Sequence, residues 1–168
     1  VFQLKQQVGP KVIEEKEHHL VNMIDSRWHQ HPNIERLGQA TAPRLSITAL
    51  RIKTDYGYLH HGFVTAVLND LFGLQVRGGC SCAGPYGHQL LNIDKHRSER
   101  IQQALKNQEK LVKPGWVRFN LNYFLDDKEA QCILRAIEFV AQHGLTILPY
   151  YAYDQEADLW RFQNKSNS

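Results

Sequence analysis

A glycine-rich loop between Arg77 and His88 holds the side chains of this sequence that are best suited to chemistry. It contains two of the three cysteines, Cys80 and Cys82, with one residue between them. A thiol exposed on such a loop near the charge of Arg77 would have a raised thiolate fraction, as a nucleophilic cysteine requires. The turn expected at 83–85 favours Cys82 as the nucleophile. The alternative is that both cysteines only fill small spaces under a tight loop, and the residues alone leave the two interpretations open.

The Cys-x-Cys pair also raises the question of a metal site. A structural zinc site needs four ligands, which usually come as two close pairs. The third cysteine, Cys132, lies in an apolar helical stripe, where we expect a small packed residue. His88 and His96 are further candidates, but their spacing does not complete a site. We therefore predict no metal.

A second polar element is Arg118, which lies in the middle of a predicted strand. The alternation there puts Val117, Phe119, Leu121 and Tyr123 on the core side and Trp116, Arg118, Asn120 and Asn122 on the other. A mid-strand arginine beside asparagines suits a bidentate grip on a carboxylate or a phosphate. The alternative is a solvated arginine on an exposed face of the sheet.

Hydrophobic periodicity predicts the helices that position these residues. Amphipathic or buried helices are expected at 10–28, 60–72 and 127–143. Gly73 would end the second helix in a left-handed conformation, and Gly144 would end the third. A polar helix at 94–107 should be peripheral, and residues 2–8 should form a separate turn or kinked extension.

Alternating apolar residues predict strands at 34–37, 44–53, 74–77, 116–124, 145–153 and 159–162. The expected fold is α/β, of the α+β small-domain type. In it, a small and mainly antiparallel sheet is built from 44–53, 74–77, 116–124 and 145–162. The helices at 10–28, 60–72 and 127–143 would pack on one face of this sheet.

Length and composition indicate one globular domain, spanning residues 1–168 with a polar tail at 164–168. Hydrophobic residues make up 42% and charged residues 22% of the chain, which excludes disordered and fibrous classes. The net charge of +3 is spread among acids without a basic stripe, so we expect no nucleic-acid partner. No apolar run is long enough for a membrane span and no signal peptide is recognisable, so we expect no membrane partner. An odd number of cysteines, two of them close together, favours a reducing cytoplasm.

Two stretches carry a resemblance to a known family. The loop at 77–85 and the Gly-Trp-Val-Arg strand at 115–120 are similar, in sequence and in order, to the C-terminal part of class V aminotransferases. The strand that begins at 44 and the His60-His61 pair before an apolar helix fit the same order. These pyridoxal phosphate enzymes include cysteine desulfurases and selenocysteine lyases, and the resemblance covers nearly the whole chain.

The resemblance implies a fold and roles for particular residues. The chain would be the C-terminal small domain of a fold-type I enzyme that acts on an amino acid by transamination or cysteine desulfuration. Cys82 would be the catalytic cysteine, Arg118 would bind the substrate α-carboxylate, and Arg77 would line the same pocket or contact the substrate. Cys80, His88 and Asn120 are possible further residues of the pocket lining.

The resemblance also implies that the chain does not work alone. None of its lysines stands in the family's Ser-x-His-Lys context, so the lysine that binds pyridoxal phosphate would belong to a large N-terminal domain. Residues 1–30 would be the helix linking that domain to this one, no covalent cofactor is expected here, and the parent enzyme would be a homodimer. The alternative is a non-catalytic module, such as a thiol or sulfur acceptor or a dimerisation piece.

Overall fold

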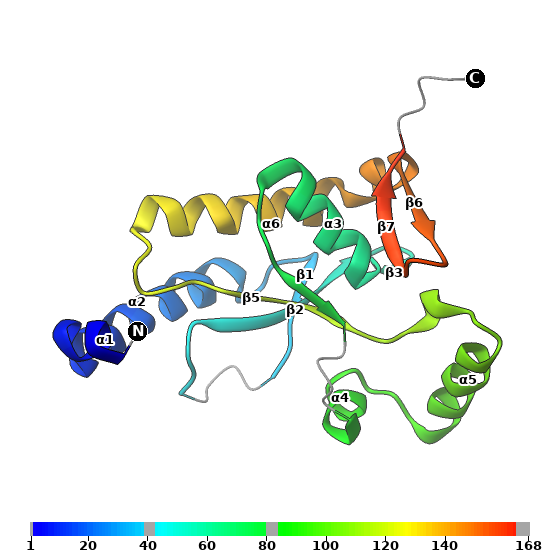
Figure 1. The fold of residues 1–168 in the computed structure, drawn as a ribbon, viewed down its shortest axis with the longest axis horizontal. Helices are drawn as coiled ribbons and strands as arrows, with labels where there is room; N and C mark the ends of the chain where they lie inside the picture. Colours follow the sequence, from blue (N-terminus) through cyan, green and yellow to red (C-terminus); the bar gives the residue numbers. More distant parts are fainter. Residues whose placement is uncertain (1, 39–42, 80–83, 164–168) are drawn as a thin grey trace.

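The computed structural model describes residues 2–38, 43–79 and 84–163 and has the predicted mixed α/β architecture, a small antiparallel sheet with helices packed on it (Figure 1). The helices are α1 (Phe2–Val8), α2 (Pro10–Trp28), α3 (His61–Phe72), α4 (Gly84–Leu90), α5 (Lys95–Lys106) and α6 (Asp127–Ile147), with 3₁₀ turns η1 (Lys110–Val112) and η2 (Leu148–Tyr150). The strands are β1 (Ile34–Arg36), β2 (Ile47–Thr54), β3 (Gly57–Tyr58), β4 (Arg77–Gly79), β5 (Trp116–Asn120), β6 (Tyr151–Asp154) and β7 (Leu159–Phe162).

Strand β5 lies inside the main sheet, with β2 on one side and β4 on the other. The strand order is β1-β2-β5-β4, and every neighbouring pair is antiparallel. The short β3 pairs with the end of β2. Strand β4 therefore stands at an edge of this order, next to the cysteine loop.

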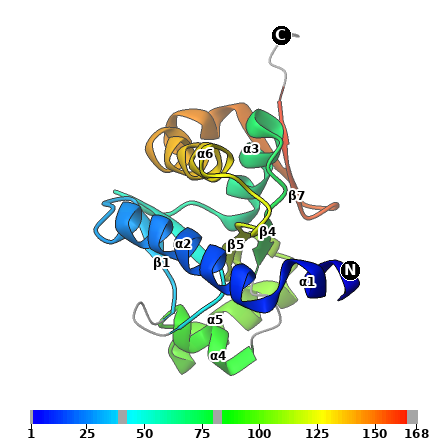
Figure 2. The ribbon, with the colours of Figure 1, turned by 90° about the vertical axis from the view of Figure 1, so that its left-hand side faces the viewer.

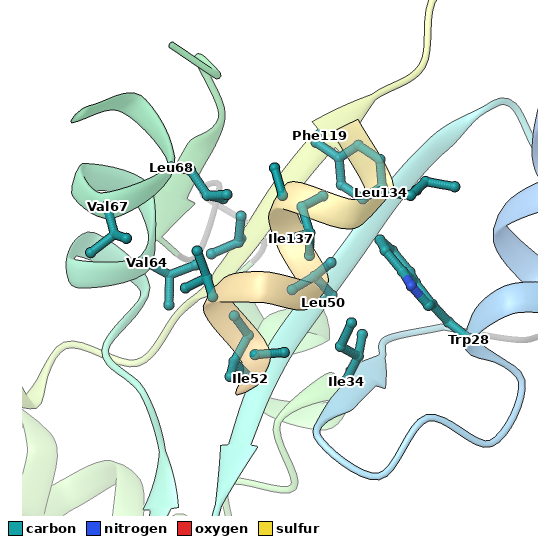
Figure 3. Packing of buried hydrophobic residues seen from close by; sticks show 14 of the residues in the cluster. Trp28, Ile34, Leu50, Ile52, Val64, Val67, Leu68, Phe119, Leu134 and Ile137 are labelled. Atoms are coloured by element: carbon teal, nitrogen blue, oxygen red, sulfur yellow. The ribbon is translucent and has the colours of Figure 1, made fainter. Parts of the chain in front are cut away.

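The main core lies between the sheet and the helices α2, α3 and α6. Val117 and Phe119 of β5 are buried there, as the alternation predicts. Figure 3 shows Leu134 and Ile137 of α6 above the sheet, with Trp28 of α2 reaching in from the side. The rings of Trp28 and Phe119 meet edge to face, with centroids 5.7 Å apart. These contacts hold three helices to one face of the sheet, as predicted.

The opposite face of the sheet carries a second, smaller cluster. Its buried members are Leu91, Ile93 and Trp116. Helices α4 and α5 lie on this side, below the sheet in Figure 2, whereas α3 and α6 lie above it. Helix α5 buries none of its own residues, in keeping with the predicted peripheral helix. The segment before α5, however, covers Trp116, so the face predicted to be polar and aromatic is partly closed.

Helix α6 runs to Ile147, so the prediction that Gly144 ends it is wrong. Gly144 is buried, and a Cβ atom there would lie 2.4 Å from Leu59 Cδ1. The glycine therefore allows close packing of the helix on Leu59 and does not act as a terminator. The helix gives way to the 3₁₀ turn that contains Pro149, a residue without the N–H that a continuing helix requires.

The longer α6 also changes the C-terminal strands. The first of them begins at Tyr151 and not at residue 145. Strands β6 and β7 pair only with each other, as a two-stranded sheet. The prediction that they belong to the main sheet is therefore wrong. This hairpin packs on α3, where Phe63 meets the rings of Tyr151 and Trp160.

Three strands of the main sheet differ clearly from the predicted ranges. Strand β2 begins at Ile47 and not at residue 44. Strand β4 covers 77–79 instead of 74–77, because Leu74 and Val76 leave α3 packed against the core before the ladder begins. Strand β5 ends at Asn120 and not at residue 124. There the Asn122 side chain accepts a hydrogen bond from the Phe124 N–H and turns the chain toward α6.

Residues 2–8 form the helix α1, which Gly9, with φ of 86°, separates from α2, so they are the kinked extension that was predicted. The prediction for Cys132 was wrong. Cys132 is exposed and not packed, because it lies beside the buried stripe that Ala130 and Leu134 form on α6. Within the described residues, no helix combines the length and the apolar character that a membrane crossing needs.

The core predicts a clear stability difference along α6. Leu134→Ala should lower the free energy of unfolding by about 2–5 kcal/mol, because Leu134 is fully buried and its loss leaves a cavity. Cys132→Ala, on an exposed position of the same helix, should change it by less than about 0.5 kcal/mol. Urea denaturation of both variants measures the difference. Equal losses would show that α6 does not pack on the sheet through this face.

Candidate functional site

Arg77 and Arg118 lie opposite each other in the β4–β5 ladder. They are direct partners in the antiparallel register, so their side chains leave the same face of the sheet. Arg118 is half-buried and Arg77 is exposed. Neither guanidinium group has a hydrogen bond or an ion pair with another described residue. Two like charges therefore face each other across the ladder without an anion from the described part of the protein.

The neighbours of this arginine pair on the sheet differ in size and burial. On the other side of Arg118, its partner in β2 is Ala49, a small side chain. Along β5 the same face carries buried Trp116 and exposed Asn120. The Ser46 hydroxyl lies 3.2 Å from Asn120 Oδ1 and holds the end of that side chain in place. Along β5, the arginine pair is therefore bordered by the buried ring of Trp116 on one side and by the exposed amide of Asn120 on the other.

The other predicted site residues are placed differently. Cys80 and Cys82 lie outside the described residues. His88, on α4, is half-buried and lines a cavity at the edge of β4, and neither Arg77 nor Arg118 is among the residues lining that cavity. The structure therefore brings Arg118, Arg77 and Asn120 onto one face and puts His88 in a different place.

A histidine pair that the sequence analysis did not assign to a site lies at the start of α3. His60 is the N-cap residue, and its Nδ1 accepts hydrogen bonds from the Gly62 N–H, at 3.1 Å, and from Trp160 Nε1, at 3.0 Å. The ring of His61 stacks on that of His60, with centroids 4.2 Å apart. The pair therefore joins the helix start to the β6–β7 hairpin.

Glycines make the space for His61. A Cβ atom at Gly115 would lie 2.4 Å from His61 Cδ2, and one at Gly78 would lie 2.7 Å from Thr65 Oγ1 and 3.1 Å from His61 Nδ1. The distances of 2.4 and 2.7 Å are shorter than van der Waals contact allows, so a side chain at Gly78, in β4, or at Gly115, just before β5, would force its neighbours to move.

An ion pair borders the histidines. The Lys113 ammonium binds the Asp158 carboxylate, and the Tyr153 hydroxyl donates to the same carboxylate at 2.6 Å. The hydrogen bond with Lys113 holds the pKa of Asp158 below its usual value. The positive charge of Lys113 and the negative charge of Asp158 thus compensate each other in this ion pair.

Burial disfavours the charged form of both histidines. It is the main reason why the pKa of His60 falls to about 4, and the neighbouring His61 adds to the effect. Burial also lowers the pKa of His61. His60 Nε2 and both ring nitrogens of His61 are buried without a hydrogen-bond partner among the described residues.

The sequence contains a signal for this pair, namely two adjacent histidines before an apolar helix. Glycines in or just before two strands, Gly78 and Gly115, lie beside them in the fold. Such a signal does not show which glycine meets which ring. No group of three or more His, Cys, Asp or Glu side chains within the described ranges is placed to hold a metal ion.

Comparison with known proteins adds no family. No protein-family model matches this chain, and no curated protein sequence matches it significantly.

The histidine pair predicts a stability that depends on pH. Because the pKa of His60 is about 4 in the fold and near 6.5 when unfolded, the unfolded chain binds more protons between these values. Stability should therefore fall as the pH decreases from about 6.5 to about 4. His60→Asn keeps an acceptor at the N-cap that does not titrate, and should reduce this loss.

Urea denaturation at several pH values measures the effect. His96→Asn, at an exposed position of α5, is the control and should keep the wild-type profile. A wild-type profile in the His60→Asn chain would show that His60 does not titrate as the burial implies.

Proposed function

We propose that this chain is the small domain of a pyridoxal phosphate enzyme of the class V aminotransferase type, and that Arg118 binds the α-carboxylate of its amino-acid substrate with the help of Arg77. The observation that carries the proposal is the register pair of two arginines without an anionic partner among the described residues. The loop at 77–85 and the strand at 115–120, which resemble that family, contain both arginines.

The electrostatics of the pair favour an anionic ligand. Like charges directly opposite each other in a ladder destabilise the sheet. A carboxylate between two guanidinium groups removes this repulsion and accepts charge-assisted hydrogen bonds from both. The residue opposite Arg118 in β2 is Ala49, which has no charge to compete for the ligand, and exposed Asn120 on the same face offers a further polar group.

The described residues do not form a pyridoxal phosphate site by themselves. Of the described lysines, only Lys110 and Lys113 are not exposed. Lys110 donates to the carbonyl groups of Gln155 and Glu156, and Lys113 pairs with Asp158, so neither is free to bind a cofactor covalently. The proposal therefore requires a large domain that supplies the cofactor lysine, and the role of this chain is to bind and orient the substrate.

Both transamination and cysteine desulfuration fit this role, because both begin with an α-amino acid held by its carboxylate. In a desulfuration, Cys82 would be the nucleophile that takes the substrate sulfur. The proposed setting is a cytoplasmic homodimer.

The test is kinetic and uses the enzyme that contains the cofactor domain. Arg118→Ala should raise KM for the amino acid roughly 10- to 150-fold, as the loss of a charge-assisted hydrogen bond of about 1.5–3 kcal/mol implies. Arg135→Ala, at an exposed position on α6, is the matched control and should leave KM unchanged. An unchanged KM in the Arg118 variant would refute the carboxylate assignment. A protein without the visible absorption of bound pyridoxal phosphate would refute the enzyme class.

A further inference from the structure

A cavity of about 920 Å³ lies at the edge of β4, between the start of α3, the hairpin strand β7 and helix α5. Figure 1 shows these elements around one end of the sheet, with α3 and β7 above and α5 below. Several of its walls are apolar, formed by Ala66, Val76, Ile101, Leu105, Leu159 and Trp160. The cavity is therefore suited to a small molecule with substantial apolar surface.

Among the polar residues that line this space, the histidine pair has buried ring nitrogens without a hydrogen-bond partner in the described part of the chain. His60 and His61 both line the cavity. Because His60 Nδ1 already accepts two hydrogen bonds, the hydrogen of the neutral ring must lie on Nε2. That N–H group is buried and has no acceptor among the described residues, and both ring nitrogens of His61 are likewise buried without a partner there. Buried polar groups without partners are uncommon and point to a ligand or a water that completes them.

The charges in the wall favour a neutral ligand. Lys113 is already paired with Asp158, so its ammonium is not available to balance an anion. The second carboxylate of the lining, Asp70, accepts a hydrogen bond from the Tyr151 hydroxyl at 3.0 Å. With two carboxylates, Asp70 and Asp158, and one ammonium group, Lys113, these residues have a net negative charge, which would repel a carboxylate or a phosphate.

We propose that this cavity binds a neutral, largely apolar small molecule whose carbonyl or hydroxyl oxygen accepts a hydrogen bond from His60 Nε2–H. His61, whose ring lies close to Gly78 and Gly115, lines the same cavity beside His60. The site is separate from the proposed carboxylate site, since neither Arg77 nor Arg118 lines it. The proposal of a ligand in this cavity does not depend on the proposed enzyme class.

Three probes of similar shape test the proposal on the chain itself. Benzamide carries a neutral carbonyl, benzoate is its charged analogue, and toluene lacks the acceptor. Titration followed by ¹⁵N NMR of the histidine rings should show benzamide binding with a shift of the His60 Nε2 resonance. Its dissociation constant should be roughly 2- to 12-fold lower than that of toluene, as one neutral hydrogen bond provides. Benzoate should bind more weakly than benzamide.

Two adjacent glutamines on α5 provide matched variants. Gln102 lines the cavity and is exposed, so Gln102→Trp should fill the space and abolish benzamide binding without disturbing the core. Gln103, the next residue, is exposed and does not line the cavity, and Gln103→Trp should bind benzamide as the wild type does.

Three results would overturn the proposal. The first is the absence of any benzamide shift at millimolar concentration, which would mean that water alone completes the histidines. The second is equal affinity for the three probes, which would remove the hydrogen bond from the account. The third is unchanged binding in the Gln102→Trp chain, which would place the ligand elsewhere.

Discussion

The pairing of β5 with β2 on one side and β4 on the other is the interaction on which the rest of this structure depends. Its register sends Val117 and Phe119 into the core beneath α6 and sends Arg118 to the opposite face. A shift of one residue would exchange the two faces, exposing the apolar side chains and burying the arginine. The same register brings Arg77 opposite Arg118. One ladder thus connects the stability of the core to the geometry of the candidate site.

The two faces of β4 have different neighbours. Gly78 faces α3 and leaves room for Thr65 and His61, whereas Arg77 belongs to the face with Arg118. The proposed carboxylate site and the histidine cavity therefore share a strand without sharing side chains. A ligand at either place would add contacts to β4, an edge strand with few residues of its own.

Local sequence patterns predicted much of the fold. The features that they did not predict depend on contacts between residues that are distant in the sequence. The alternation of β5 and the left-handed Gly73 at the end of α3 were predictable, because both signals lie within a few residues. Gly144 was misjudged because its neighbour Leu59 is remote in sequence. Arg118 could be selected as a candidate from its strand, but its pairing with Arg77 depends on a register that the sequence does not state. The cavity at the histidines was not predictable for the same reason, since its walls come from segments that are distant along the chain.

The most direct test of the central claim is the coupling free energy between Arg77 and Arg118 in the absence of a ligand. It is measured by urea denaturation of the wild type, Arg77→Gln, Arg118→Gln and the double variant at low ionic strength. An unneutralised pair predicts a repulsive coupling of about 0.2–1 kcal/mol that disappears in roughly 1 M salt. A coupling of zero or of attractive sign at low ionic strength would mean that the protein already neutralises these arginines, and would contradict the account of an anion site.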